Sequence, residues 1–172
     1  ASAREAGVSG QVLYANLLWA SQSGCERDEL FLSQGEVLLG ERAFARAAFG
    51  ADPWGRNADQ MFAELSGTDS TGKRGLEAAR LPPETVATHA DIEQQVIPFA
   101  DAVAAAIAAR DYKIVGATTS VEQTASSIAF LQRVKALRAD VTTILGGANC
   151  DGPMADEVAA LLREKQRKAV QI

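Results

Sequence analysis

The chain has 172 residues, of which 47% are hydrophobic and 23% charged, and its 17 basic and 22 acidic side chains give a net charge of −5. This balance is typical of a globular domain, and it lacks the basic excess of a general nucleic-acid binder. Two cysteines and one histidine exclude a four-cysteine cluster and any two-histidine metal motif. No apolar run reaches the roughly 20 residues of a membrane span. We therefore expect a single cytoplasmic domain over 1–172, with neither nucleic acid nor membrane as a partner.

The first half of the chain predicts one strand, helical segments and a loop. The nearly continuous apolar run from Gln11 to Trp19 is typical of a strand covered on both faces. Residues 25–52 are helical in composition, with an apolar stripe that ends at Gly50, and a short helix is expected at 58–65. Residues 66–75 hold no apolar side chain, so we expect a flexible loop over 66–76.

That loop contains the spacing of a phosphate-binding P-loop, from Gly67 to Lys73. Arg74 stands where the motif needs a serine or threonine for magnesium, and the preceding segment is predicted as a helix and not as the required strand. We therefore reject this interpretation.

The second half indicates alternating helices and strands. A long helix is expected over 83–110, with Pro98 bending or splitting it. Strands are expected at 112–118 and 141–145, followed by helices at 120–139 and 151–168, and residues 169–172 can begin a further strand. This order requires parallel strands, which we expect at 12–18, 112–118 and 141–146. The predicted fold is a three-layer, Rossmann-like (flavodoxin-like) α/β sheet with helices on both faces.

Two strand-to-helix turns hold the candidate binding residues. In the first, Ser120 is the expected N-cap, because Gln123 completes a capping box, and the hydroxyls of Thr118 and Thr119 are expected to be free. The second contains Gly146, Gly147 and Asn149, and is followed by Asp151 as the N-cap and by Pro153 in the first helical turn.

Ligands of open parallel sheets bind at the carboxyl ends of the strands, where helix N-termini favour phosphate. We therefore expect the six candidate residues to converge in one cleft there: Thr118, Thr119, Ser120, Gly146, Gly147 and Asn149. Gly147→Leu should fill that cleft with little effect on folding, provided that the glycine has a negative φ. The alternative is that the hydroxyls only cap a helix and the glycines only turn the chain.

Other reactive residues are expected to be structural. Cys150 lies near a helix start without a histidine close in sequence, so it is interpreted as a small apolar filler. His89 is expected at the surface or in a cap. Four charged residues are interpreted as solvated helix faces and not as acid–base pairs: Glu41, Arg42, Glu93 and Asp101. No catalytic residue and no metal ligand is predicted.

The segment Ile114 to Met154 resembles the amino-terminal, cobalamin-binding-like region of radical S-adenosylmethionine (SAM) enzymes, and most closely the RiPP maturation radical SAM proteins, which modify ribosomally made peptides. Val115 to Ser120 matches a strand ending in VGxTS, and the following EQxxAS is matched from Glu122 to Ser126. Gly146 to Met154 matches GGANCxGPM. Upstream, VLYANLLWASQSG is similar to that family's second strand and the loop after it.

The resemblance implies a bacterial, Rossmann-like domain whose strand ends hold the nucleotide tail of cobalamin, with the six candidate residues as the contacts. It also implies a first strand preceding Ala1, and thus a fragment of a larger enzyme. The DxHxxG motif that supplies a cobalt ligand is absent, so cobalamin would bind without one.

The CxxxCxxC motif is absent too, so the resemblance assigns the iron–sulfur cluster and S-adenosylmethionine to a separate catalytic domain. That domain is the implied partner, together with a precursor peptide. The alternative is a protein-interaction module with a vestigial ligand site.

Overall fold

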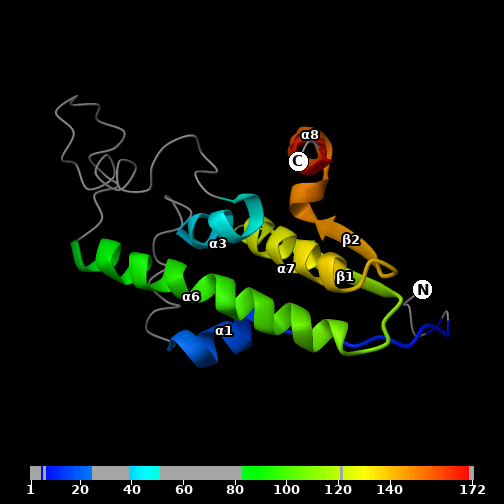
Figure 1. Cartoon of the computed structure of the whole chain (residues 1–172), viewed down its shortest axis with the longest axis horizontal. Helices are drawn as coiled ribbons and strands as arrows, with labels where there is room; N and C mark the ends of the chain where they lie inside the picture. The colour runs from blue at the N-terminus through cyan, green and yellow to red at the C-terminus, as the bar shows by residue number, and fades with distance from the viewer. Residues whose placement is uncertain (1–4, 6, 25–38, 51–82, 121, 171–172) are drawn as a thin grey trace.

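The structure, a computed structural model, describes residues 5, 7–24, 39–50, 83–120 and 122–170. The expected helix at 58–65 and loop at 66–76 lie outside this part. The described elements, in chain order, are α1 (Ala15–Ser23), α3 (Leu39–Phe49), α6 (Pro83–Ala108), β1 (Ile114–Thr119), α7 (Thr124–Leu137), β2 (Thr142–Gly147), the short 3₁₀ helix η2 (Ala148–Cys150) and α8 (Gly152–Val170). The chain is thus a mixed α/β structure (Figure 1).

The two strands form a parallel pair, as predicted. The register runs from Ile114 opposite Thr142 to Thr119 opposite Gly147, so both strands end at the same edge. Helix α7 connects them and packs on the sheet, where the Ser127 hydroxyl donates a 2.7 Å hydrogen bond to the carbonyl of Thr118. The strand–helix–strand unit predicted for the last third of the chain is confirmed.

The two faces of this sheet have different surroundings. Side chains such as Val115 point toward the helices, where Val115 packs against Ala104 and Val134. On the opposite face, Ile114 is 60% exposed and Ile144 is 50% exposed. The expected third layer is therefore not among the described elements, and helices on both faces stay a prediction.

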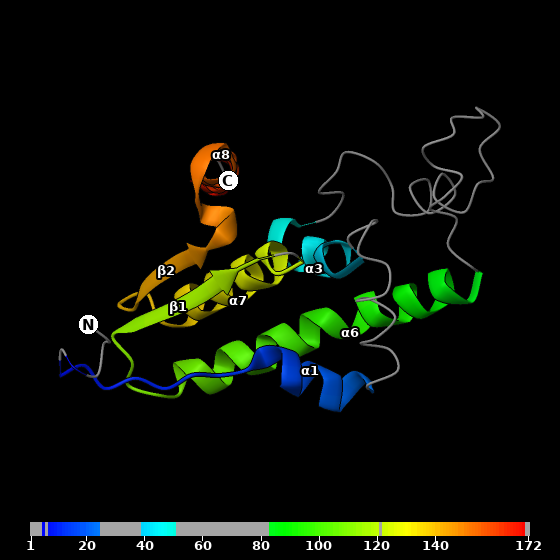
Figure 2. The same cartoon turned by 180° about the vertical axis from the view of Figure 1, so that it is seen from behind.

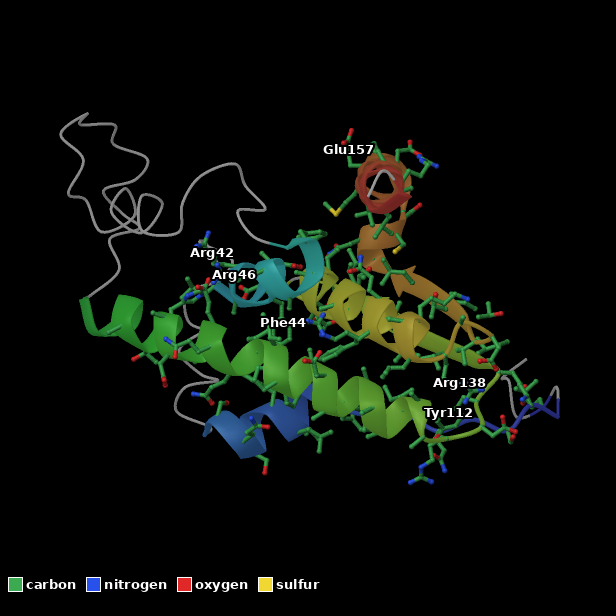
Figure 3. The ribbon with its side chains drawn as sticks, viewed as in Figure 1. Arg42, Phe44, Arg46, Tyr112, Arg138 and Glu157 are labelled. Atoms are coloured by element: carbon green, nitrogen blue, oxygen red, sulfur yellow. The ribbon has the colours of Figure 1, made fainter. Side chains whose placement is uncertain are left out.

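The core lies between the helices and not within the sheet. Helix α6 is continuous through Pro98, so the proline does not split it. The Phe99 ring packs edge-on against Trp19 of α1 and Phe130 of α7, with centroids 4.9 and 6.0 Å apart. Phe44 of α3 lies on the side of its helix that faces α6 (Figure 3) and packs edge-on against Trp19 and Phe130. Four helices therefore meet at one aromatic cluster.

The predicted strand at 12–18 is wrong. Residues from Ala15 onward form α1, which lies beside α6 (Figures 1 and 2), and residues 8–14 have no regular secondary structure. A short apolar run fits a strand and a helix equally well, and after Val12 this run holds no β-branched residue. In α1 only Trp19 is buried, so the expectation of burial on both sides also fails.

The remaining boundaries differ from the predictions by a few residues. Helix α3 ends at Phe49, and Gly50 follows it with φ +91°, as expected for the glycine after a helix. Helix α8 extends to Val170, so no strand begins at 169. No described helix is long and apolar enough to cross a membrane.

Candidate functional site

The carboxyl edge of the sheet brings the six candidate residues together. Thr118 pairs with Gly146, and Thr119 pairs with Gly147, in the strand register. The turn after β2 then brings the amide of Asn149 to the carbonyl of Ser120, at 2.8 Å. We call these six residues, 118–120, 146, 147 and 149, the sheet edge.

The polar groups of the sheet edge bond mainly to one another. The Thr119 hydroxyl is buried and donates a 3.0 Å hydrogen bond to the carbonyl of Gly146, and it also lies 3.5 Å from the Cys150 sulfur. The expectation of a free hydroxyl at Thr119 is therefore wrong. Because the two strands end side by side, the Gly146 carbonyl lies within hydrogen-bond distance of the Thr119 hydroxyl.

Asn149 bridges the two turns. Its Nδ2 donates 2.8 Å hydrogen bonds to the carbonyl of Ser120 and to the hydroxyl of Thr124. An amide nitrogen has two hydrogens, so both are used inside the protein. Asn149 therefore fixes the turn after β2 to the first residue of α7.

Ser120 is not the N-cap of α7, contrary to the prediction. The helix begins at Thr124 after Gln123, which makes no side-chain cap, and the Ser120 carbonyl accepts a bond from the Gln123 amide. The cap comes from α3. The two carboxylate oxygens of Glu41 accept hydrogen bonds of 2.7 and 2.6 Å from the backbone amides of Thr124 and Ala125.

This carboxylate changes the electrostatics of the sheet edge. A helix N-terminus attracts anions because its first amides have no partner within the helix and because of the helix dipole. At α7 the Glu41 carboxylate already supplies that negative charge. The expectation that the start of α7 offers free donors to a phosphate is therefore not met at Thr124 and Ala125.

The two glycines of the sheet edge have different roles. Gly147 has φ +108°, and a Cβ atom there would lie 2.6 Å from the Thr119 nitrogen and 2.8 Å from the Thr118 hydroxyl. The condition of a negative φ is not met, so Gly147→Leu would disturb the strand ends themselves. A Cβ atom on Gly146 would meet no atom within 4 Å, so this position opens outward.

The start of α8 follows the prediction more closely. Asp151 directly precedes the helix, and its carboxylate accepts a 2.8 Å hydrogen bond from the amide of Gly152. Pro153 lies in the first turn, where a missing N–H costs little. Helix α8 leaves the sheet on the side away from α1 and α6 (Figures 1 and 2).

The contacts at the start of α3 were not predicted from the sequence. Glu122 has φ +61°, and its carboxylate accepts a 2.8 Å hydrogen bond from the amide of Gly40. Glu41, on α3, therefore caps the start of α7, and Glu122, just before α7, binds the start of α3 in return. Burial, and then the negative charge of Glu41, raises the pKa of Glu122, while the Gly40 amide lowers it. The signal in the sequence that could have indicated a cap from elsewhere is that the first turn of α7 has no acidic residue of its own.

His89 is buried, contrary to its expected place at the surface. Its side chain is 0% exposed, and its Nε2 lies 3.3 Å from the carbonyl of Leu39, to which it donates. Arg42, only 7% exposed, donates a 3.1 Å bond to Glu93, so the interpretation of solvated faces is wrong for this pair. Asp101 is exposed and pairs with Arg133.

These positions limit the chemistry of the site. In the described part of the chain, no three histidine, cysteine or acidic side chains are grouped to hold a metal ion. His89 lies between α6 and α3, where its ring has no access to a bound ligand. The sheet edge offers outward space and a hydroxyl, and it holds no nucleophile paired with a base.

Comparisons of the chain with protein-family models, with curated proteins and with solved structures find no match.

Proposed function

We propose that this chain is the cofactor-binding, Rossmann-like domain of a bacterial radical SAM enzyme that modifies ribosomally made peptides. Its sheet edge binds the nucleotide tail of cobalamin. The iron–sulfur cluster and S-adenosylmethionine belong to a separate catalytic domain, which is the partner of this one, with the precursor peptide as its substrate. The resemblance of residues 114–154 to that family supplies the identity of the ligand.

One observation carries the proposal. Thr118 and Gly146 are opposite each other at the ends of adjacent parallel strands, and the missing side chain of Gly146 leaves open space beside the exposed Thr118. Glycine at such a place lets a ligand approach the backbone closely. The carboxyl edge of a parallel sheet is also where ligands of this fold class bind.

The fit to cobalamin concerns its tail and not its metal. Cobalamin supplies cobalt chemistry when it is bound, but the buried His89 is not placed to ligate the metal. Thr118 would donate or accept a hydrogen bond with the tail, and Gly146 would provide room. Thr119 and Asn149 would act indirectly, because their hydrogen bonds hold the two strand ends in position.

A second function is favoured by a different observation. The Thr119 hydroxyl, both Nδ2 hydrogens of Asn149 and the first amides of α7 all have partners within the chain. A site whose donors are satisfied internally is what a vestigial ligand site would look like. The domain would then act as a protein-interaction module attached to the catalytic domain.

Titration of the purified chain with hydroxocobalamin separates these functions. We expect the wild-type protein to retain the corrinoid after dialysis, with a shifted visible spectrum. Gly146→Leu should weaken binding at least tenfold without changing the far-UV circular dichroism. Gly10→Leu is the matched control, because a Cβ atom on Gly10 also meets nothing within 4 Å, and it should bind as wild type.

Two outcomes would contradict the proposal. If the wild-type protein retains no corrinoid, the domain does not bind it and the interaction module is the better function. If Gly146→Leu binds as tightly as wild type, the sheet edge is not the binding site.

A further inference from the structure

Four consecutive residues at the start of α3 are each bound to a different place in the fold. We call residues 39–42 the α3 junction. The Leu39 carbonyl binds His89 of α6, the Gly40 amide binds Glu122, the Glu41 carboxylate binds the first amides of α7, and the Arg42 side chain binds Glu93 of α6. A movement of this one turn therefore changes the contacts of both neighbouring helices.

His89 contacts the α3 junction from α6, and its burial favours the neutral ring. Burial is the main cause that lowers its pKa to about 4, the Leu39 carbonyl raises it, and the positive charge of Arg42 lowers it further. The positive end of the α3 dipole lies beside the ring and disfavours a second positive charge there. A carboxylate oxygen of Glu93 lies 3.7 Å from Nδ1 of His89, but the same oxygen accepts a hydrogen bond from Arg42.

We propose that the α3 junction is a latch that opens when His89 is protonated and that its opening releases Glu41 from the start of α7. A protonated ring that is 0% exposed needs water or a counter-charge, and the Glu93 carboxylate oxygen 3.7 Å from Nδ1 already accepts a hydrogen bond from Arg42. The ring gains water, or it takes this oxygen from Arg42, and either change loosens the first turn of α3 from α6. Leu39 and Glu41 belong to that same turn, so the carboxylate leaves the amides of Thr124 and Ala125 together with it.

The latch extends to the sheet edge through one further bond. Thr124, whose amide binds Glu41, also accepts a hydrogen bond from Asn149 through its hydroxyl. Opening of the latch therefore frees two amides and loosens the residue that Asn149 holds. The latch does not require the cofactor proposed above, so either proposal can fail without the other.

A permanent positive charge at position 89 tests the latch at neutral pH, and arginine supplies it because a guanidinium stays protonated even when buried. We expect His89→Arg to lower the hydrogen-exchange protection of the Thr124 and Ala125 amides at least tenfold. The neutral control His89→Gln should change it less than threefold. Amides in the middle of α6 should stay protected in both variants, because only the junction opens.

A double mutant shows whether the effect passes through Glu41. Glu41→Ala alone should expose the same two amides, and adding His89→Arg should expose them less than twofold further. The latch is wrong if His89→Arg leaves Thr124 and Ala125 protected, or if His89→Gln exposes them equally. It is also wrong if His89→Arg removes protection throughout α6, because the charge then unfolds the domain and does not open one contact.

Discussion

The α3 junction and the sheet edge both contact the start of α7, and they use polar groups differently. At the junction, charged side chains from separate helices bind buried backbone groups, such as Glu41 on the amides of Thr124 and Ala125. At the sheet edge, short neutral groups bind one another, and one position, Gly146, faces open space. The difference teaches that the junction holds helices together, while the edge leaves space open beside Gly146.

The largest effect is expected where the helices meet. Phe99→Ala should lower the free energy of unfolding by about 3–5 kcal/mol, because it removes a buried ring that contacts Trp19 and Phe130. Urea unfolding followed by circular dichroism measures this loss. Ile144→Ala, on the exposed face of the sheet, is the matched control and should cost less than about 1 kcal/mol. Equal losses would mean that the exposed face of the sheet contributes as much to stability as the helical core.

The second test separates the two glycines of the sheet edge. Gly147→Ala should destabilise the protein by about 1–3 kcal/mol, the usual cost of a strained backbone region, because its φ of +108° and ψ of −173° lie in a region that essentially only glycine adopts. The new Cβ atom also meets the Thr119 nitrogen at 2.6 Å, which adds to this cost. Gly146→Ala should stay within about 0.5 kcal/mol, as for an exposed site. Similar melting temperatures for the two variants would contradict the division of roles between these glycines.

The smallest effect concerns the charge of Glu122. The pKa of this carboxyl is raised in the folded protein, so the stability it contributes is fully present below the usual value of 4.5 and falls as the pH rises through the raised value. Glu122→Gln keeps an oxygen that can accept from the Gly40 amide but removes the charge near Glu41. We therefore expect a gain of no more than about 1 kcal/mol at pH 7, since water screens this partly exposed site.

The pH dependence of that gain is the decisive part of the measurement. Thermal unfolding at pH 7 and at pH 3 should show a gain at the first pH that disappears at the second. A loss of stability at pH 7 would mean that the charged carboxylate holds Gly40 better than the neutral amide does.

The parts of the fold that were predictable have local signals. The runs ending at Thr119 and Gly147 are followed by helices, and this order alone requires a parallel pair, which is the arrangement observed. The run from Gln11 to Trp19 carries no such constraint. Its apolar residues suit either element, and Trp19 is buried because α3 and α6 offer the rings of Phe44 and Phe99 beside it.

The location of the candidate site was predictable from the sequence, but the hydrogen bonds of its residues were not. The order of strands and helices predicted that the six candidate residues would meet at the carboxyl edge, and the observed register brings Thr118 opposite Gly146 there. The capping of α7 was not predictable from the local pattern, because Glu41 lies more than 80 residues away in the chain. A serine three residues before a glutamine indicates a cap only if no stronger acceptor arrives, and a carboxylate is the stronger acceptor.

Two arginines, one on α7 and one directly after it, also bind backbone carbonyls at the C-terminal ends of α3 and α6. Arg133 donates to the carbonyl of Ala47 near the end of α3. Arg138 (labelled in Figure 3), directly after α7, donates to the carbonyls of Ala108 and Arg110 at the end of α6. One residue inserted near Ser127 would turn everything after it by about 100° around the helix axis. Both arginines would then point away from their carbonyls at once. During evolution, changes of length in this protein are therefore expected outside α7, whose fourteen residues set the spacing between its neighbours.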